Sequence, residues 1–242
     1  MQPRMNFFDL SIIRFFNSFA QRSAGFDHLV VQISHNTLVR GGFMVALFLW
    51  AWNRYRDEYS EQREFLLFGL LASVSAIFVA RALALALPFR ARPLDNPLLG
   101  FRLPIGMDPD ALLGWSAFPS DHAALFFCLA ACLWMVSKRL GTIAFCYSIF
   151  VISLPRIYLG IHHPTDIIGG AVIGIGVACL SRIVWLRKRV TRPVLQWSTA
   201  NPPFFNALMF LLSFEIAELF ESVRHIGLAG YHSVQVILQT LK

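Results

Sequence analysis

The sequence predicts an all-α membrane protein, a polytopic helical bundle with about five or six spans plus interfacial helices. Of its 242 residues, 56% are hydrophobic and only 14% are charged, and the mean hydropathy is +0.57. The basic residues that produce the net charge of +7 occur in short blocks between apolar segments. This composition excludes an ordinary soluble domain and a disordered chain. The placement of the charges is typical of membrane topology, so we expect membrane lipids and not nucleic acid as partners.

The N-terminal residues 6–36 form two short halves separated by residues 21–25. Each half is too short and too polar to cross a hydrocarbon core, which requires about 20 apolar residues. Apolar residues recur at helical spacing in the first half, at Phe7, Phe8, Ile12, Phe15, Phe16 and Phe19. We expect two short helices that lie in the interface or form a re-entrant hairpin, with one irregular spanning unit as the alternative. The pattern of a cleavable signal peptide is not evident here.

The catalytic bundle is expected within residues 38–186. Its predicted spans are residues 42–52, 65–87, 123–136, 142–154 and 166–185. A long proline-rich loop separates the second span from the third, because proline ends a helix and favours irregular backbone. Glycines at four positions of the fifth span suit close helix packing, namely Gly169, Gly170, Gly174 and Gly176.

A further apolar segment, residues 204–223, carries the glutamates Glu215, Glu218 and Glu221. These polar residues favour an interfacial helix over a sixth span. No linker separates the segments, so residues 1–242 are expected to form one domain. The four cysteines fall inside apolar segments without the spacing of a metal site, and we interpret them as packing residues.

The distribution of lysine and arginine predicts the orientation. One side carries Arg54, Arg56, Arg63, Lys138, Arg139, Arg187, Lys188, Arg189 and Arg192. The other side carries only Arg90, Arg92, Arg102 and Arg156. By the positive-inside rule the first side is cytoplasmic, and the candidate site described next faces outward.

The most informative stretch is residues 154–170, LPRIYLGIHHPTDIIGG, which brings Arg156, His162 and Asp166 to the start of an apolar span. Ionisable residues at such a place are expensive and indicate function. A neutral imidazole at His162 can attack phosphorus, and Asp166 one helical turn away can orient it and stabilise its cation. Capping of the helix by Asp166 is the structural alternative. His163 falls off this spacing and is interpreted as interfacial, with a contact to the substrate as the alternative.

Two other clusters lie beside apolar segments. In FPSDH, residues 118–122, Ser120 suits an N-cap whose free N–H groups form an anion site, and His122 could donate a proton to a leaving oxygen. In RARP, residues 90–93, the planar fork of Arg92 matches phosphate oxygens, as does that of Arg156. Taken alone, a capping serine and lipid-binding arginines would explain these clusters. Together the three clusters indicate a phosphate site.

These clusters resemble the three signature motifs of the type 2 phosphatidic acid phosphatase superfamily, membrane lipid phosphatases with a histidine nucleophile. The third motif of that family is Ser-Arg, five residues, His, three residues, Asp. Arg156, His162 and Asp166 match it, and Pro155 stands in the serine position. The second motif, Pro-Ser-Gly-His, corresponds to residues 119–122.

The first motif of the family, Lys, six residues, Arg-Pro, matches at Arg92 and Pro93, but Leu85 occupies the lysine position. Arg90 and Arg81 are the candidates for the missing cation, and Arg81 could instead pair within the bundle or snorkel. Asp121 stands where the family has glycine. Its negative charge would repel a phosphate unless a cation neutralises it. The resemblance covers roughly residues 40–186, and it is closest to the bacterial undecaprenyl-diphosphate phosphatase branch.

The resemblance implies a metal-independent hydrolase, without a cofactor, in a bacterial cytoplasmic (inner) membrane, acting in the cell envelope with its site facing the periplasm or outside. His162 would attack the terminal phosphorus, Asp166 would hold its other ring nitrogen, and His122 would protonate the leaving group and then activate water. Arg92, Arg156 and Ser120 would bind the phosphoryl oxygens. The implied substrate is undecaprenyl diphosphate or a related lipid phosphate.

Three other functions are compatible with the sequence. The same phosphohistidine could be passed to a sugar or lipid acceptor, which would make the protein a phosphotransferase. Leu85 and Asp121 would suit a non-catalytic, lipid-binding pseudo-enzyme. A haem carrier would need paired histidines facing the bundle interior, whereas His122 and His162 stand at span ends beside arginines. The identity of the lipid, the number of its phosphates and the oligomeric state stay open.

Overall fold

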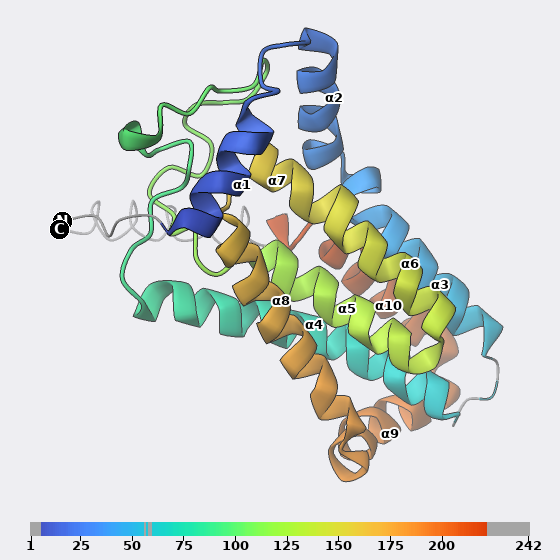
Figure 1. Ribbon diagram of the computed structural model, residues 1–242. Helices are drawn as coiled ribbons and strands as arrows, with labels where there is room; N and C mark the ends of the chain where they lie inside the picture. The colour runs from blue at the N-terminus through green and yellow to red at the C-terminus, as the bar shows by residue number, and fades with distance from the viewer. Residues whose placement is uncertain (1–5, 56, 58–59, 222–242) are drawn as a thin grey trace, which may run out of the picture.

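The computed structural model describes residues 6–55, 57 and 60–221, which fold into helices joined by loops (Figure 1). The α-helices are α1 (Phe7–Asn17), α2 (Ala24–His35), α3 (Phe43–Arg54), α4 (Glu61–Ala86), α5 (Asp121–Val136), α6 (Lys138–Tyr147), α7 (Leu154–Tyr158), α8 (Pro164–Cys179), α9 (Val184–Ala200) and α10 (Pro202–Ala217). No β-strand occurs among the described residues. The prediction of an all-α bundle is confirmed.

Three helical stretches of the described chain are long and apolar enough to cross a membrane. They are Glu61–Ala86, Lys138–Tyr158 and Pro164–Arg182, of 26, 21 and 19 residues. Helix α6 continues through a π-helical segment, Ser148–Ser153, into α7, which makes the second of these stretches continuous. Asp121–Val136 and Pro202–Ala217 are apolar but shorter. The predicted spans therefore correspond to helices, and the membrane depth of the shorter ones stays a prediction.

Helix α5 is the centre of the bundle, packed between α4, α6 and α8 (Figure 1). Every residue from Ala123 to Leu133 is buried, because α5 is apolar on all sides and has neighbours on all sides. Gly170 and Gly174 allow α8 to approach it closely. A Cβ atom at either glycine would lie 2.2 Å from a backbone oxygen of α5 or its cap. Gly176 has no neighbour of this kind within 4 Å, so this glycine does not serve the predicted packing.

The predicted N-terminal helices are present as α1 and α2, each with a side-chain N-cap, from Asn6 and Ser23. They lie over the end of the bundle where α7 and α8 meet (Figure 1). Helix α1 is joined to the loop between α4 and α5 by two reciprocal hydrogen bonds between Asn17 and the backbone of Arg102, of 2.7 and 2.9 Å. Helices α1 and α2 therefore cover one end of the bundle.

The proline-rich loop between α4 and α5 covers the same end of the bundle. It is irregular apart from a short 3₁₀-helix, Pro97–Leu99. Backbone hydrogen bonds hold it in place, including one from Leu94 N–H to the Gly160 carbonyl (3.1 Å) and one from Ala117 N–H to the Arg90 carbonyl (2.8 Å). The loop, α1 and α2 together cover this end of the bundle.

At the opposite end, the predicted span 166–185 corresponds to the helical stretch Pro164–Arg182, which ends three residues earlier than predicted. The helix ends at Arg182, the chain turns at Ile183, and α9 then runs as a separate helix. Arg187 of α9 is buried and bonds Glu64 and Glu61 of α4 at 3.1 and 2.6 Å, which fixes α9 against α4. The predicted apolar segment 204–223 corresponds to α10, and its residues 222–223 lie outside the described residues.

Candidate active site

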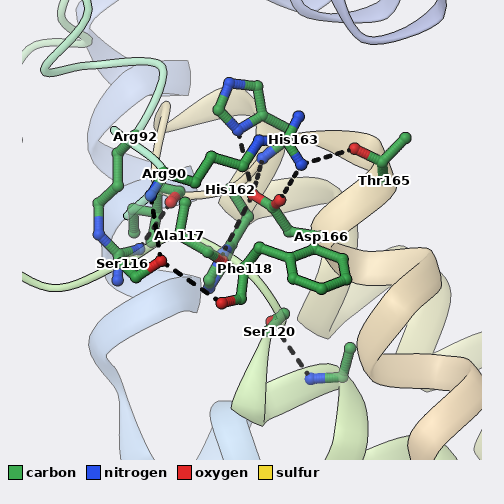
Figure 2. A network of polar contacts seen from close by, with 12 residues as sticks. Arg90, Arg92, Ser116, Ala117, Phe118, Ser120, His162, His163, Thr165 and Asp166 are labelled. Carbon is green, nitrogen blue, oxygen red and sulfur yellow. Dashed lines mark hydrogen bonds and ion pairs between the residues drawn. The ribbon is translucent and has the colours of Figure 1, made fainter. Parts of the chain in front are cut away.

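All three sequence clusters meet at the enclosed end of the bundle (Figure 2). Asp166 lies in the first turn of α8, and His162 lies in the turn between α7 and α8. Ser120 caps the start of α5, with its hydroxyl accepting the Ala123 N–H at 3.4 Å. A backbone hydrogen bond from Ser120 N–H to the Asp166 carbonyl, 3.0 Å, joins the second cluster to the third.

His162 is buried, and one ring nitrogen is already engaged. Its Nδ1 lies 2.9 Å from the Ala117 carbonyl oxygen (Figure 2). A carbonyl only accepts, so Nδ1 carries the proton and Nε2 keeps the lone pair of the neutral ring. Burial lowers the pKa of His162 below its usual value, the charge of Arg92 lowers it further, and Asp166 opposes both effects. The imidazole is therefore neutral, with Nε2 available as a nucleophile.

The Asp166 carboxylate is shared between two histidines and an arginine. Its Oδ2 accepts the His163 N–H at 2.7 Å and lies 3.1 Å from His163 Nδ1 and 3.7 Å from His162 Nδ1. Its Oδ1 accepts from Arg90. Asp166 therefore caps α8, which was the structural alternative, and it also lies beside His162 as predicted. One carboxylate makes both sets of contacts. His163 is buried, so its interpretation as interfacial is wrong.

Arg92 and Arg156 are buried guanidiniums that form no ion pair among the described residues. Arg92 donates from NH1 to the Ile161 carbonyl at 2.6 Å, and its Nε is buried without a hydrogen-bond partner. Arg156 donates to the Ile152 carbonyl at 2.9 Å. Burial lowers the pKa of Arg92, and the nearby carboxylate of Asp121 opposes this. Two buried cations without counter-ions define a site for an anion.

His122 lies at the start of α5, next to Asp121. Its Nδ1 is 3.3 Å from the Asp121 carboxylate, which can only accept, and its Nε2 is buried without a hydrogen-bond partner. Of the buried side-chain polar atoms without a partner in the described chain, this Nε2 and the Nε of Arg92 belong to predicted site residues. Unpaired buried polar atoms are costly, so these two atoms are candidates to bond a substrate.

The candidates for the missing cation have other partners. Arg81 forms an ion pair with Asp121 and stacks over Trp115, with 4.8 Å between its guanidinium carbon and the ring centroid. Arg90 bridges the carboxylates of Asp166 and Asp9. Leu85, in the lysine position of the family motif, is 88% exposed on α4.

Two residues near the site were not identified from the sequence. Asp9 of α1 is fully buried, and a carboxylate within an otherwise apolar helical stripe was the available signal. Arg40 lies in a π-helix, Leu38–Gly42, and acts electrostatically on both His122 and Arg156. Its Nε is buried without a partner, although NH2 bonds Glu221 at 3.2 Å. The presence of a π-helix, a frequent feature of functional sites, cannot be read from the sequence.

The arrangement combines a neutral imidazole, a carboxylate behind it, a second histidine, and two cations without counter-ions. Such a set can bind a phosphoryl group and transfer it to nitrogen. Within the described residues, no group of three or more His, Cys, Asp or Glu side chains is placed to hold a metal ion.

Comparison with known proteins gives the class to which this site belongs. Residues 88–189 match the PAP2 superfamily. This segment contains Arg90, Arg92 and the whole of the second and third clusters, and it is a PAP2-superfamily segment. The resemblance predicted from the motifs is confirmed.

Individual relatives extend this result. The chain is 28% identical over 145 residues to the "Putative undecaprenyl-diphosphatase YbjG" of Escherichia coli, covering 59% of this chain and 65% of that protein. It is 44% identical over 62 residues to the "Lipid A 4'-phosphatase" of Bacteroides thetaiotaomicron, covering 25% and 28%. The chain thus spans less than two thirds of the length of these curated relatives. The fold is similar to the crystal structure of LpxE from Aquifex aeolicus, with a TM-score of 0.53 and 23% identity over 75% of this chain and 98% of that one.

Proposed function

We propose that the protein is a metal-independent phosphatase that hydrolyses a lipid phosphate or diphosphate through a phosphohistidine at His162. The observation that carries this proposal is the pair of buried guanidiniums, Arg92 and Arg156, without ion pairs among the described residues, in a site with a neutral imidazole. A phosphoryl group is the anion that satisfies arginine forks and reacts with an imidazole nitrogen. The PAP2 match and the names of the relatives support this choice.

In the first step, Nε2 of His162 forms a bond to the terminal phosphorus, and the bond from phosphorus to the leaving oxygen breaks. The ring becomes cationic, and the Nδ1 proton bonded to Ala117 and facing Asp166 stabilises that charge. Arg92, Arg156 and the hydroxyl of Ser120 hold the non-bridging oxygens. His122 acts here in its imidazolium form, with the Nδ1 proton on Asp121, and transfers the Nε2 proton to the leaving oxygen.

In the second step, water attacks the phosphohistidine, and His122, now neutral, accepts a proton from that water. The phosphorus–nitrogen bond breaks and its electron pair returns to His162. One water is consumed, and one inorganic phosphate and the dephosphorylated lipid product are released.

Our preferred substrate is a polyprenyl diphosphate such as undecaprenyl diphosphate, on the outer face of a bacterial cytoplasmic membrane. Its support is the similarity over 145 residues to the relative named for that activity and the excess of basic residues on the side predicted to be cytoplasmic. Phosphatidate, phosphatidylglycerophosphate and lipid A phosphates are the alternative substrates, and the shorter match to a named lipid A 4'-phosphatase favours the last of these.

The experiment is phosphate release by detergent-purified full-length protein with EDTA present, offered undecaprenyl diphosphate, phosphatidate, phosphatidylglycerophosphate and lipid A in parallel. The His162→Ala variant is expected to lose turnover while keeping its thermal unfolding temperature. His35→Ala is the matched control, because His35 is exposed on α2 and bonds only its own helix. Near-normal turnover in His162→Ala would exclude the proposed nucleophile.

Other outcomes select the alternatives. Transfer of the phosphoryl group to an added sugar or lipid acceptor without free phosphate would identify a phosphotransferase. Binding of all four lipids without turnover would identify a pseudo-enzyme. A Soret absorption band in the purified protein would identify a haem carrier.

A further inference from the structure

Asp9 is a fully buried carboxylate outside the segment that matches the PAP2 superfamily. Its Oδ1 accepts the Thr165 N–H at 2.9 Å, and its Oδ2 accepts from the Thr165 hydroxyl and from Arg90, both at 2.6 Å. Asn6 adds a third donor to Oδ2 at 3.1 Å. Burial of a charge is costly unless it is paired and hydrogen-bonded, and Asp9 meets both conditions. Helix α1 is therefore bound to the first turn of α8.

Arg90 connects Asp9 to the site. One end of its fork bonds Asp9, and the other bonds Asp166 Oδ1 and, at 2.8 Å, the hydroxyl of Thr165. Both ends are thus engaged by protein atoms, in contrast to Arg92, whose Nε is without a partner. Arg90 contacts the carboxylate behind the nucleophile.

The orientation of the Asp166 carboxylate depends on this contact. The χ2 rotation of an aspartate is broad, so hydrogen bonds decide which oxygen faces which neighbour. Arg90 occupies Oδ1, and this leaves Oδ2 toward His162 and His163. The charge of Arg90 is in turn divided between two carboxylates, so the charge of Asp9 determines how strongly Arg90 neutralises Asp166.

We propose that Asp9 and Arg90 are positioning residues that, through Asp166, orient the imidazole of His162 and set its basicity. This inference rests on the proposed function for its kinetic readout. Neither residue touches the transferred phosphoryl group in this scheme. The N-terminal helix thereby contributes to the reaction from outside the PAP2-superfamily segment.

Two variants have opposite expected effects. Asp9→Asn keeps the size of the side chain but removes its charge, so Arg90 acts on Asp166 alone and the imidazolium of His162 is stabilised less. Arg90→Gln leaves two carboxylates without their shared cation, so the imidazolium is stabilised more. In both variants kcat is expected to fall about 10- to 100-fold, as for other losses of alignment, with a smaller change in KM. The acid limb of the pH–kcat profile moves to lower pH in Asp9→Asn and to higher pH in Arg90→Gln. Arg90→Lys retains the charge and is expected to restore the position of the limb.

Asp27→Asn is the matched control. Asp27 is equally buried in α2, and it bonds Tyr158 and the N–H groups of Gln21 and Ile105, none of which contacts Asp166. Its loss is expected to lower the unfolding temperature without moving the acid limb. If the Asp9 and Arg90 variants lose stability in the same way and their limbs stay in place, their role is structural and the positioning inference fails.

A second measurement does not depend on turnover. The His162 ring is titrated by NMR in the full-length protein with labelled histidine, and its signal is assigned from the spectrum of His162→Ala. The ring is expected to titrate at lower pH in Asp9→Asn and at higher pH in Arg90→Gln. Absence of phosphatase activity with these shifts present would reject the proposed function but retain the coupling. Normal activity with no shift in either variant would reject the coupling alone.

Discussion

Arg81 of α4 and Asp121 of α5 form an ion pair next to His122 of the candidate site. Asp121 is the residue that departs from the glycine of the family motif, and Arg81 lies one helical turn before the position of the missing lysine. Residues four apart share one helix face, so Arg81 approaches the site from the same side as residue 85. The positive charge of Arg81 thus compensates the negative charge that Asp121 places next to His122.

The first prediction tests this pair. Arg81→Ala leaves the Asp121 carboxylate without its cation beside a phosphate site, and kcat/KM is expected to fall about tenfold or more. The double variant Arg81→Ala/Asp121→Gly removes both charges and is expected to recover most of that loss. A double-mutant cycle on kcat/KM measures the coupling, and strict additivity of the two changes would contradict the assigned role of the pair.

The second prediction concerns pH. Burial and the charge of Arg92 lower the pKa of His162, so the ring stays neutral and nucleophilic at pH values where an exposed histidine is half protonated. The acid limb of kcat/KM is expected to have its midpoint below about 6.5, the ordinary pKa of histidine. Asp166→Asn removes the group that raises this pKa, so the limb should move to still lower pH while kcat falls. A limb that moves upward in Asp166→Asn would contradict the sign of this coupling.

The third prediction concerns the packing of α8 on α5. A methyl group at Gly174 would lie 2.2 Å from the Ala124 carbonyl oxygen and 2.9 Å from the Cys128 nitrogen, so Gly174→Ala must push the helices apart. We expect a loss of about 1–3 kcal/mol in stability, together with lower turnover, because Ser120 and Asp166 are held by these helices. Gly176→Ala, on the same helix with open space around it, should have no such effect. Thermal unfolding in detergent compares the two, and equal unfolding temperatures would reject the close approach.

The fourth prediction concerns Arg40. Its charge acts on His122 and Arg156, and it is a cation near the site that the family motifs do not include. Arg40→Gln is expected to raise KM for a lipid diphosphate about tenfold, the lower end of what charge focusing supplies, with a smaller change in kcat. Arg22→Gln removes an exposed charge on the loop before α2 and is the control. An unchanged KM in Arg40→Gln would show that this arginine serves only to hold the residues that follow α10.

Much of the fold follows from local sequence. Apolar runs of the right length gave the helices, and the prolines between residues 88 and 119 correctly predicted an irregular loop. The spacing of Arg156, His162 and Asp166 predicted a common location because all three lie around one helix start.

The remaining features depend on contacts between distant parts of the chain. The hydrogen bond of Asp9 with Arg90 joins residues 81 positions apart, and the periodicity of apolar residues in the sequence cannot predict a contact between such distant positions. The sequence placed Arg187 among the basic residues of the cytoplasmic side. In the structure it is buried against Glu64, and this contact fixes α9 against α4. His163 was assigned from motif spacing alone, whereas its burial follows from its bonds with Asp166.

The bond between Asp9 and Thr165 also has a consequence for biosynthesis. The two residues are 156 positions apart, and at about 5–20 residues per second the ribosome needs about 10–30 s between them. Arg90, 81 positions after Asp9, emerges about halfway through that interval, but the Asp9 carboxylate has no partner from α8 until the interval ends. The docking of α1 therefore waits for α8, and the nascent chain cannot orient its nucleophile before α8 has emerged and met α1. Assembly of the reactive centre and docking of α1 on α8 would then be a single event.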